Sequence, residues 1–211
     1  MTLSELYKIA DYKDSKGMLF NGDCLEYLKK MEDNSIDLII TSPPYNLGKF
    51  HHTNNHHFQA YSEYDDNMPE ELYQKWQVEI LNENGCVLWN VSYGSDATVN
   101  TEAIGLMWLS IADIIRQTNF TVADRIVWKK ASALPNNVSK NKLTRTVEDV
   151  FVFCRKGEYK TFNCNKEVSS IGKNGQTFYK NTFNFIEAKN NDGSCKLNKA
   201  TYSSDLCKQL L

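Results

Sequence analysis

Short apolar runs alternate with amphipathic stretches along most of this 211-residue chain, and that alternation restricts its fold more than any other feature. The runs at 18–20, 36–40, 85–93, 121–130 and 147–157 have strand character, and the stretches at 68–83 and 100–120 have helical spacing. A run without polar alternation, such as 36–40, suits a parallel strand that is covered on both faces. The pattern therefore predicts an α/β protein with a mostly parallel central sheet and helices on both faces.

Two expectations about the core follow from the same patterns. The helix at 100–120 has its apolar positions at Ile104, Met107, Leu109, Ile111, Ile114 and Ile115. Three tryptophans, Trp89, Trp108 and Trp128, lie in strand or helix patterns, so we expect them in the core rather than stacked against a ligand.

Composition bounds the class of protein. Hydrophobic residues make up 41% of the chain and charged residues 24%, which is ordinary for a globular domain, with or without a small appendage. No stretch reaches the roughly 20 apolar residues needed to span a bilayer, and the N-terminus lacks the pattern of a secretory signal. The six cysteines are scattered without a CxxC pair, which favours reduced thiols in a cytoplasmic protein and argues against a zinc cluster.

Although the net charge is only −2, the charges are unevenly distributed between the two halves of the chain. Residues 1–124 contain 8 Lys and Arg against 19 Asp and Glu, whereas residues 125–199 contain 15 against 6. An excess of positive charge in one half hints at a polyanionic partner on that side, and a merely solvated basic surface is the alternative.

The strand at 36–40 ends in a rigid turn, Thr41-Ser42-Pro43-Pro44-Tyr45. In an open parallel sheet, ligands bind beyond the carboxyl ends of the strands. The two prolines fix φ and remove two backbone donors, so the turn presents carbonyl oxygens with little freedom. Ser42 adds a hydroxyl and Tyr45 a flat aromatic face. This set suits an amino group on a planar ring, such as a nucleic-acid base; a plain strand end with Tyr45 in the core is the alternative.

The TSPPY sequence resembles the catalytic motif of the DNA amino-methyltransferases, which move a methyl group from S-adenosylmethionine to cytosine N4 or adenine N6. The resemblance runs from about Met18 to the end of the chain. FNGDCLEYL resembles the upstream cofactor motif, GCVLWNVSY the next strand, and RIVWKKASALPNN with LTRTVEDVFVFCRKG the later strand pair. NKATYSSDLCKQLL is similar to the motif that opens the cofactor-side helix, although Asn198-Lys199 stand where the family usually has His-Pro.

This resemblance implies a Rossmann-like S-adenosylmethionine-dependent methyltransferase fold and a mechanism. The target base flips out of double-stranded DNA, Tyr45 stacks on it, and the Ser42 hydroxyl and Pro43 carbonyl accept hydrogen bonds from its amine. Holding both N–H bonds localises the nitrogen lone pair for attack on the sulfonium methyl, without a metal or a covalent intermediate. The implied catalytic residues are Ser42, Pro43, Pro44 and Tyr45. The implied cofactor-binding residues are Asp23, Cys24, Ala200, Thr201 and Tyr202, with Asp23 meeting the adenine amine of the cofactor.

The base is less sharply indicated than the reaction. Serine before Pro43, where an acidic residue is more usual, fits the cytosine N4 branch, and ATYSSDL resembles the cytosine-type late motif. TSPPY followed by Asn46 also occurs among adenine N6 enzymes. Cytosine N4 is therefore favoured, with adenine N6 as the alternative.

The order of the motifs matches the family subgroup in which a cofactor loop of the type Phe-x-Gly-x-Gly comes last, and this chain has no such loop. The join at 82–85 is also shorter than the family's usual helix and turn. We therefore expect that the catalytic domain is incomplete, or that some of its segments are not included in this sequence. On this reading residues 1–162 form the first part of the catalytic core, 163–197 the target-recognition region, and 198–211 the start of the cofactor-side motif.

Basic residues after position 124 are candidates for the DNA face, where neutralisation of phosphates would make binding depend steeply on salt. The candidates are Lys129, Lys130, Lys140, Lys142 and Arg145. All four histidines, His51, His52, His56 and His57, fall in one polar stretch. A metal site is one interpretation of that stretch, but a solvated loop or a DNA contact is favoured, and no metal is expected.

The prediction is a bacterial-type enzyme of a restriction-modification system, with a cognate restriction endonuclease as a partner and a homodimer left open. Two rivals remain: an RNA or protein amide methyltransferase, which uses a related Pro-Pro-Tyr step, and a nucleic-acid-binding protein with a degenerate methyltransferase fold.

Overall fold

The computed structural model describes residues 1–33, 35–44, 68–82, 86–91, 103–133, 140, 143–162, 164–191, 193 and 202–211. The helices are α1 (Leu3–Ile9), α2 (Cys24–Leu28), α3 (Glu70–Asn82), α4 (Ala103–Gln117) and α5 (Ser204–Leu210), with a 3₁₀ turn at Tyr159–Thr161. The strands are β1 (Tyr12–Lys13), β2 (Met18–Leu19), β3 (Leu38–Thr41), β4 (Cys86–Val91), β5 (Phe120–Lys130), β6 (Val147–Arg155), β7 (Val168–Ile171), β8 (Thr177–Tyr179) and β9 (Phe185–Ala188).

Within the described residues, the central sheet has the strand order β3-β4-β6-β5-β9. Strands β3 and β4 are parallel, as are β5 and β9, whereas β6 runs antiparallel to both of its neighbours. Four strands therefore share one direction, as a mostly parallel sheet requires. The sequence did not reveal the reversal of β6, because a strand buried on both faces reads as a continuous apolar run in either direction.

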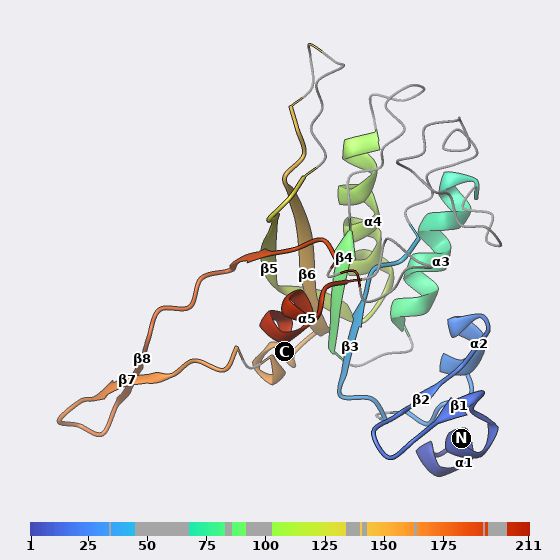
Figure 1. The fold of residues 1–211 in the computed structure, drawn as a ribbon, viewed down its shortest axis with the longest axis horizontal. Coiled ribbons are helices and arrows are strands. Elements are labelled where there is room, and N and C mark those ends of the chain that lie inside the picture. Colours follow the sequence, from blue (N-terminus) through green and yellow to red (C-terminus); the bar gives the residue numbers. More distant parts are fainter. Residues whose placement is uncertain are drawn as a thin grey trace.

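Helices cover both faces of this sheet, as predicted (Figure 1). On one face, α3 and α4 pack over Val87, Trp89 and Phe153. On the other face, α5 packs with Leu88, Val152 and Trp128. Alternate residues of β4 and β6 thus serve two separate apolar clusters, which keeps both strands buried over their length.

Two details of the expected core need correction. Leu109 of α4 is 53% exposed and Trp108 is 46% exposed, whereas Met107, Ile111 and Ile114 are buried. At 3.6 residues per turn, positions 107, 111 and 114 share one face of α4 and position 109 lies on the opposite face. Trp89 and Trp128 are buried, as expected.

The N-terminal segment forms a separate small layer. Strand β2 pairs with β1 in a two-stranded antiparallel sheet rather than joining the central sheet. Figure 1 shows α1, β1, β2 and α2 gathered at one end of the molecule. Leu25 of α2 joins the cluster beneath α3 and α4, and Lys29 forms an ion pair with Glu79 of α3.

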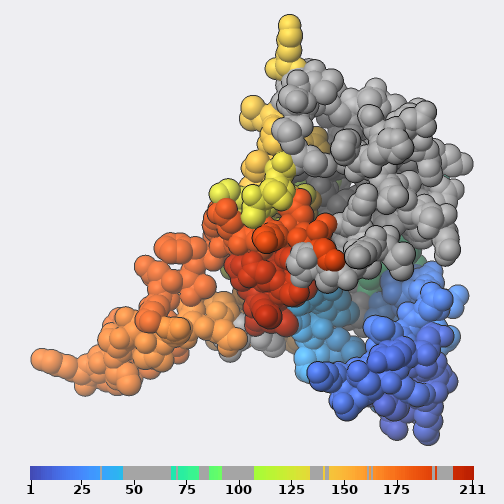
Figure 2. All heavy atoms as spheres, viewed as in Figure 1, coloured from blue at the N-terminus to red at the C-terminus, as the bar shows by residue number. Residues whose placement is uncertain are grey.

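A hairpin of β7 and β8 projects from the body as an arm (Figures 1 and 2). After the arm, β9 returns to the central sheet beside β5. No helix among the described residues is both long and apolar enough to cross a lipid bilayer.

Candidate active site at the carboxyl ends of β3 and β4

The rigid turn lies where the sequence places it, directly after β3. The register sets Ile40 beside Leu88 and Thr41 beside Trp89, so the next position, Ser42, comes level with Asn90. Pro43 is buried, and Ser42 and Pro44 are half-buried. Tyr45, the fourth residue of the expected catalytic set, lies outside the described residues.

The side chains of Ser42, Asn90 and Tyr202 form one hydrogen-bonded group on the α5 face of the sheet. The Tyr202 hydroxyl donates to Asn90 Oδ1 at 2.8 Å, and Asn90 Nδ2 donates to the backbone carbonyl of Asp149 at 3.0 Å. The Tyr202 hydroxyl is also hydrogen-bonded to the Ser42 side chain. Asn90 is only 2% exposed. The late motif is therefore joined to the turn that follows β3 through a hydrogen-bonded group whose central member, Asn90, is buried.

The segment before α5 holds Tyr202 in place. Ser203 caps α5 by accepting from the Leu206 backbone N–H at 3.2 Å, and its own hydroxyl donates to the Lys189 carbonyl at 2.9 Å. The Tyr202 ring meets the edge of Trp128 at a centroid distance of 6.1 Å. Burial raises the pKa of the Tyr202 hydroxyl, the Ser42 hydrogen bond lowers it, and the nearby Glu148 charge raises it further. The net direction is upward, so Tyr202 stays a neutral hydrogen-bonding group.

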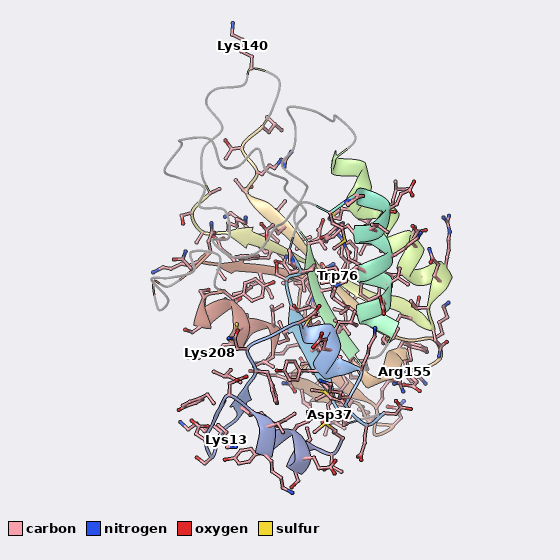
Figure 3. The ribbon with its side chains drawn as sticks, turned by 90° about the vertical axis from the view of Figure 1, so that its right-hand side faces the viewer. Lys13, Asp37, Trp76, Lys140, Arg155 and Lys208 are labelled. Atoms are coloured by element: carbon pink, nitrogen blue, oxygen red, sulfur yellow. The ribbon has the colours of Figure 1, made fainter. Side chains whose placement is uncertain are left out.

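Helix α3 holds the second proline of the turn. The Tyr73 hydroxyl donates a hydrogen bond to the Pro44 carbonyl, and the buried Tyr73 ring stacks on Trp76 with centroids 6.0 Å apart. Figure 3 shows Trp76 on this helix, beside the central strands. The turn is thus supported from both faces of the sheet, by Tyr202 on one side and by Tyr73 on the other.

The expected DNA-binding lysines on β5 are already paired with carboxylates. Lys130 forms an ion pair with Glu148, and both side chains are largely buried. Lys129 pairs with Glu187 of β9 at 2.9 Å, where both groups are half exposed. Lys140 lies at the far end of the β5–β6 connection (Figure 3). Arg145 is half-buried, and Lys142 lies outside the described residues. The role of this set in DNA binding stays a prediction.

Among the described members of the expected cofactor set, only Tyr202 is brought to the turn that follows β3. Asp23 and Cys24 begin α2, where Asp23 Oδ1 caps the helix by accepting from the Leu25 N–H at 2.9 Å. Burial, together with the charge of Asp23, raises the pKa of the Cys24 thiol. Leu25 packs on the sheet face opposite to Tyr202. Ala200 and Thr201 lie outside the described residues, as do the four histidines.

Sequence reasoning missed three residues that shape this site: Asn90, Tyr73 and Glu148. Asn90 had a readable signal, because it is a lone amide inside the apolar run CVLWNV, and a buried amide must find partners. Tyr73 had no such signal, since an aromatic residue on an amphipathic helix usually belongs to the core. Its hydroxyl contact with Pro44 depends on the tertiary packing of α3.

A second polar cluster lies on the α4 face. Asp149 is 1% exposed, and its Oδ1 accepts from Arg125 Nε at 2.8 Å and from a terminal guanidinium nitrogen at 2.7 Å. The same guanidinium lies over the Trp108 ring, 5.6 Å from its centroid. This contact explains why an exposed tryptophan is accommodated on α4.

Known proteins resemble this chain over most of its length. A relative from Bacillus subtilis, Type II methyltransferase M.BglII, is 29% identical over 158 residues, which are 71% of this chain and 38% of the relative. The DNA adenine methyltransferase YhdJ of Escherichia coli K12 is 29% identical over 147 residues, 69% of this chain and 43% of that protein. The chain thus spans about two fifths of the length of either relative.

Comparison with solved structures shows that the fold is that of a DNA methyltransferase. The solved PvuII DNA methyltransferase, described as cytosine-N4-specific, superposes with a TM-score of 0.57 at 17% identity, covering 89% of this chain and 62% of that one. The Rossmann-like methyltransferase fold is therefore confirmed. The sequence model of a family described as DNA methylase, with N6 and N4 members, matches residues 36–205. The chain belongs to this N6/N4 DNA methylase family.

Proposed function

We propose that this chain carries the catalytic turn of a site-specific DNA methyltransferase that moves a methyl group from S-adenosylmethionine to the exocyclic amine of a flipped base. The observation that carries the proposal is the group formed by Ser42, Asn90 and Tyr202 at the carboxyl ends of β3 and β4. This is the edge where an open α/β sheet binds its ligands, and the surrounding chain belongs to a DNA methylase family.

With the following roles for the residues of the turn, methyl transfer needs no strong base. Ser42 Oγ and the Pro43 carbonyl accept the two N–H groups of the amine, which orients the nitrogen lone pair. The prolines and the Tyr73–Pro44 hydrogen bond keep the turn rigid. Tyr45 stacking on the base stays part of the proposal, at a value of about 1–3 kcal/mol.

The described residues fit the cofactor in part. S-adenosylmethionine supplies an electrophilic methyl group on a sulfonium sulfur. Tyr202 belongs to the late motif and lies beside Ser42, so this segment would hold the cofactor near the amine. Asp23 lies on α2, where one carboxylate oxygen caps the helix and the other can accept from an adenine amine.

Cytosine N4 is the favoured target, because Ser42 replaces an acidic residue and the superposed PvuII enzyme is described as cytosine-N4-specific. Adenine N6 is the alternative, since the relative YhdJ is named an adenine methyltransferase. Sequencing the methylome of cells that express the full-length protein distinguishes them. We expect N4-methylcytosine in one sequence context, and a much lower level of it with Ser42→Ala. N6-methyladenine would reassign the base, and an unmodified genome together with no S-adenosylmethionine binding in calorimetry would refute the enzyme.

We also propose that the β7–β8 arm contacts the target DNA. Its exposed side chains mix apolar and basic groups: Val168, Ile171, Phe178, Tyr179, Lys166 and Lys173. An isolated two-stranded hairpin is marginal in water, so a partner that covers it would stabilise it. Because β9 belongs to the central sheet, the recognition region proposed within 163–197 narrows to about 164–184. A cognate restriction enzyme, a homodimer and a cytoplasmic location stay predictions.

The arm is tested by DNA binding at several salt concentrations. Lys173→Ala should weaken binding and reduce the slope of log affinity against log salt by about one unit. Phe178→Ala should weaken binding without changing that slope. Lys16→Ala, in the N-terminal layer, is the matched control for the charge change. Unchanged binding in both arm variants would remove the arm from the DNA interface.

A further inference from the structure

A serine hydroxyl both donates and accepts hydrogen bonds, and its proton rotates to suit its surroundings. That freedom matters for Ser42. If its hydroxyl proton pointed at the amine of a base, it would compete for the nitrogen lone pair that must attack the methyl group. A serine in this role works best when its hydroxyl proton is donated to another acceptor.

The partners of Tyr202 and Asn90 determine where that proton goes. The backbone carbonyl of Asp149 can only accept, so the Asn90 group facing it is the NH2. Asn90 Oδ1 therefore faces Tyr202 and accepts the phenol proton at 2.8 Å. With its own proton donated to Asn90, the Tyr202 oxygen can only accept from Ser42.

We propose that this series of hydrogen bonds, which ends at a backbone carbonyl, fixes the direction in which the Ser42 hydroxyl donates its proton. Ser42 donates to Tyr202, Tyr202 donates to Asn90, and Asn90 donates to Asp149, so Ser42 Oγ presents lone pairs to the amine. Tyr202 and Asn90 are then positioning residues that act through Ser42. The inference rests on the proposed methyl transfer and assigns Tyr202 a role distinct from cofactor binding.

A double-mutant cycle in the full-length protein tests the inference. Tyr202→Phe keeps the ring against Trp128 and removes only the hydroxyl, so kcat should fall about tenfold, the rate equivalent of one neutral hydrogen bond. KM for S-adenosylmethionine and for DNA should change less than twofold. In a Ser42→Ala background, Tyr202→Phe should have no further effect, because its hydroxyl acts only through Ser42. Tyr12→Phe, at an exposed tyrosine of β1, is the matched control.

An Asn90→Asp variant adds a readout that a purely structural role would not produce. Its protonated carboxyl can still donate to the Asp149 carbonyl and accept from Tyr202, whereas its ionised form sets a charge against that carbonyl. The titratable group bonded to Asn90 is Tyr202, and the titratable and charged groups near Tyr202 are Glu148, with its partner Lys130, and Cys207 of α5. The ratio of variant to wild-type kcat should therefore rise as the pH falls through the pKa of the new carboxyl.

The outcomes separate this inference from the proposed function. An inactive wild-type protein refutes the proposed function itself. If the wild type is active, two results would refute only the proposed orientation of the Ser42 hydroxyl. One is that the effects of Ser42→Ala and Tyr202→Phe are additive, and the other is that Tyr202→Phe changes only KM for S-adenosylmethionine. A flat pH ratio for Asn90→Asp, with the fold intact by circular dichroism, also overturns that orientation.

Discussion

Asp149, which is itself buried, takes part in two polar clusters that differ in chemistry. Its backbone carbonyl ends the neutral chain of Ser42, Tyr202 and Asn90 on the α5 face, while its carboxylate pairs with Arg125 on the α4 face. A chain of neutral donors and acceptors has a direction, so it can orient a hydroxyl. An ion pair between a buried carboxylate and a guanidinium has no such sequence of donors, and mainly keeps a charge compensated. The first cluster should therefore control turnover and the second stability.

The largest effect is expected from a substitution in the neutral cluster. Ser42→Ala should lower kcat about 100-fold, because an acceptor aimed at the reacting nitrogen is lost, while affinity for DNA changes little. Single-turnover methylation alongside fluorescence anisotropy with labelled duplex DNA measures both quantities. A variant that transfers methyl groups at the wild-type rate would remove Ser42 from the mechanism.

The next largest effect is expected from a substitution that breaks the ion pair in the charged cluster. Arg125→Leu should lower the free energy of unfolding by about 2 kcal/mol, since it leaves Asp149 buried without its cation. This is less than for a fully buried pair, because the Arg125 side chain is 45% exposed. Urea unfolding measures the change, with Arg116→Leu at the exposed end of α4 as the control. If Arg125→Leu instead cut kcat in the folded protein and left stability intact, the comparison would be reversed.

A smaller effect is expected at the other support of the turn. Tyr73→Phe removes the hydrogen bond to the Pro44 carbonyl but keeps the packing on Trp76. Stability should fall by about 1 kcal/mol, and kcat should fall a few-fold because the turn becomes less rigid. Thermal unfolding and initial-rate assays measure the two. Equal stability of the variant and the wild type would show that the turn does not depend on α3.

The smallest expected effect is a dependence of stability on high pH. Burial raises the pKa of Tyr202 above the usual value near 10. Above pH 10 the unfolded chain releases this proton and the folded protein keeps it, so stability falls as the pH rises. Urea unfolding at pH 9, 10 and 11 should show a steeper loss for the wild type than for Tyr202→Phe. Parallel pH curves would mean that Tyr202 is not held neutral by the fold.

The sequence predicted the elements that repeat a pattern or carry a motif. The strands at 36–40, 85–93, 121–130 and 147–157 were readable from their apolar runs, and the turn at Ser42 from its prolines. It did not predict that Tyr202 reaches Asn90, which precedes it by 112 residues, because such pairing depends on how α5 docks on the sheet. Nor did it predict the exposed Trp108, since only the structure brings Arg125 over its ring.

We propose that the turn at Ser42 serves methyl transfer to a base amine. The most direct test incubates the full-length protein with duplex DNA and S-adenosylmethionine carrying a deuterated methyl group, and then analyses the nucleosides by mass spectrometry. We expect deuterated N4-methylcytosine with the wild type and a loss of about 100-fold in its rate of formation with Ser42→Ala. Unlabelled nucleosides with the wild type, or equal labelling with Ser42→Ala, would show that the turn at Ser42 does not serve methyl transfer.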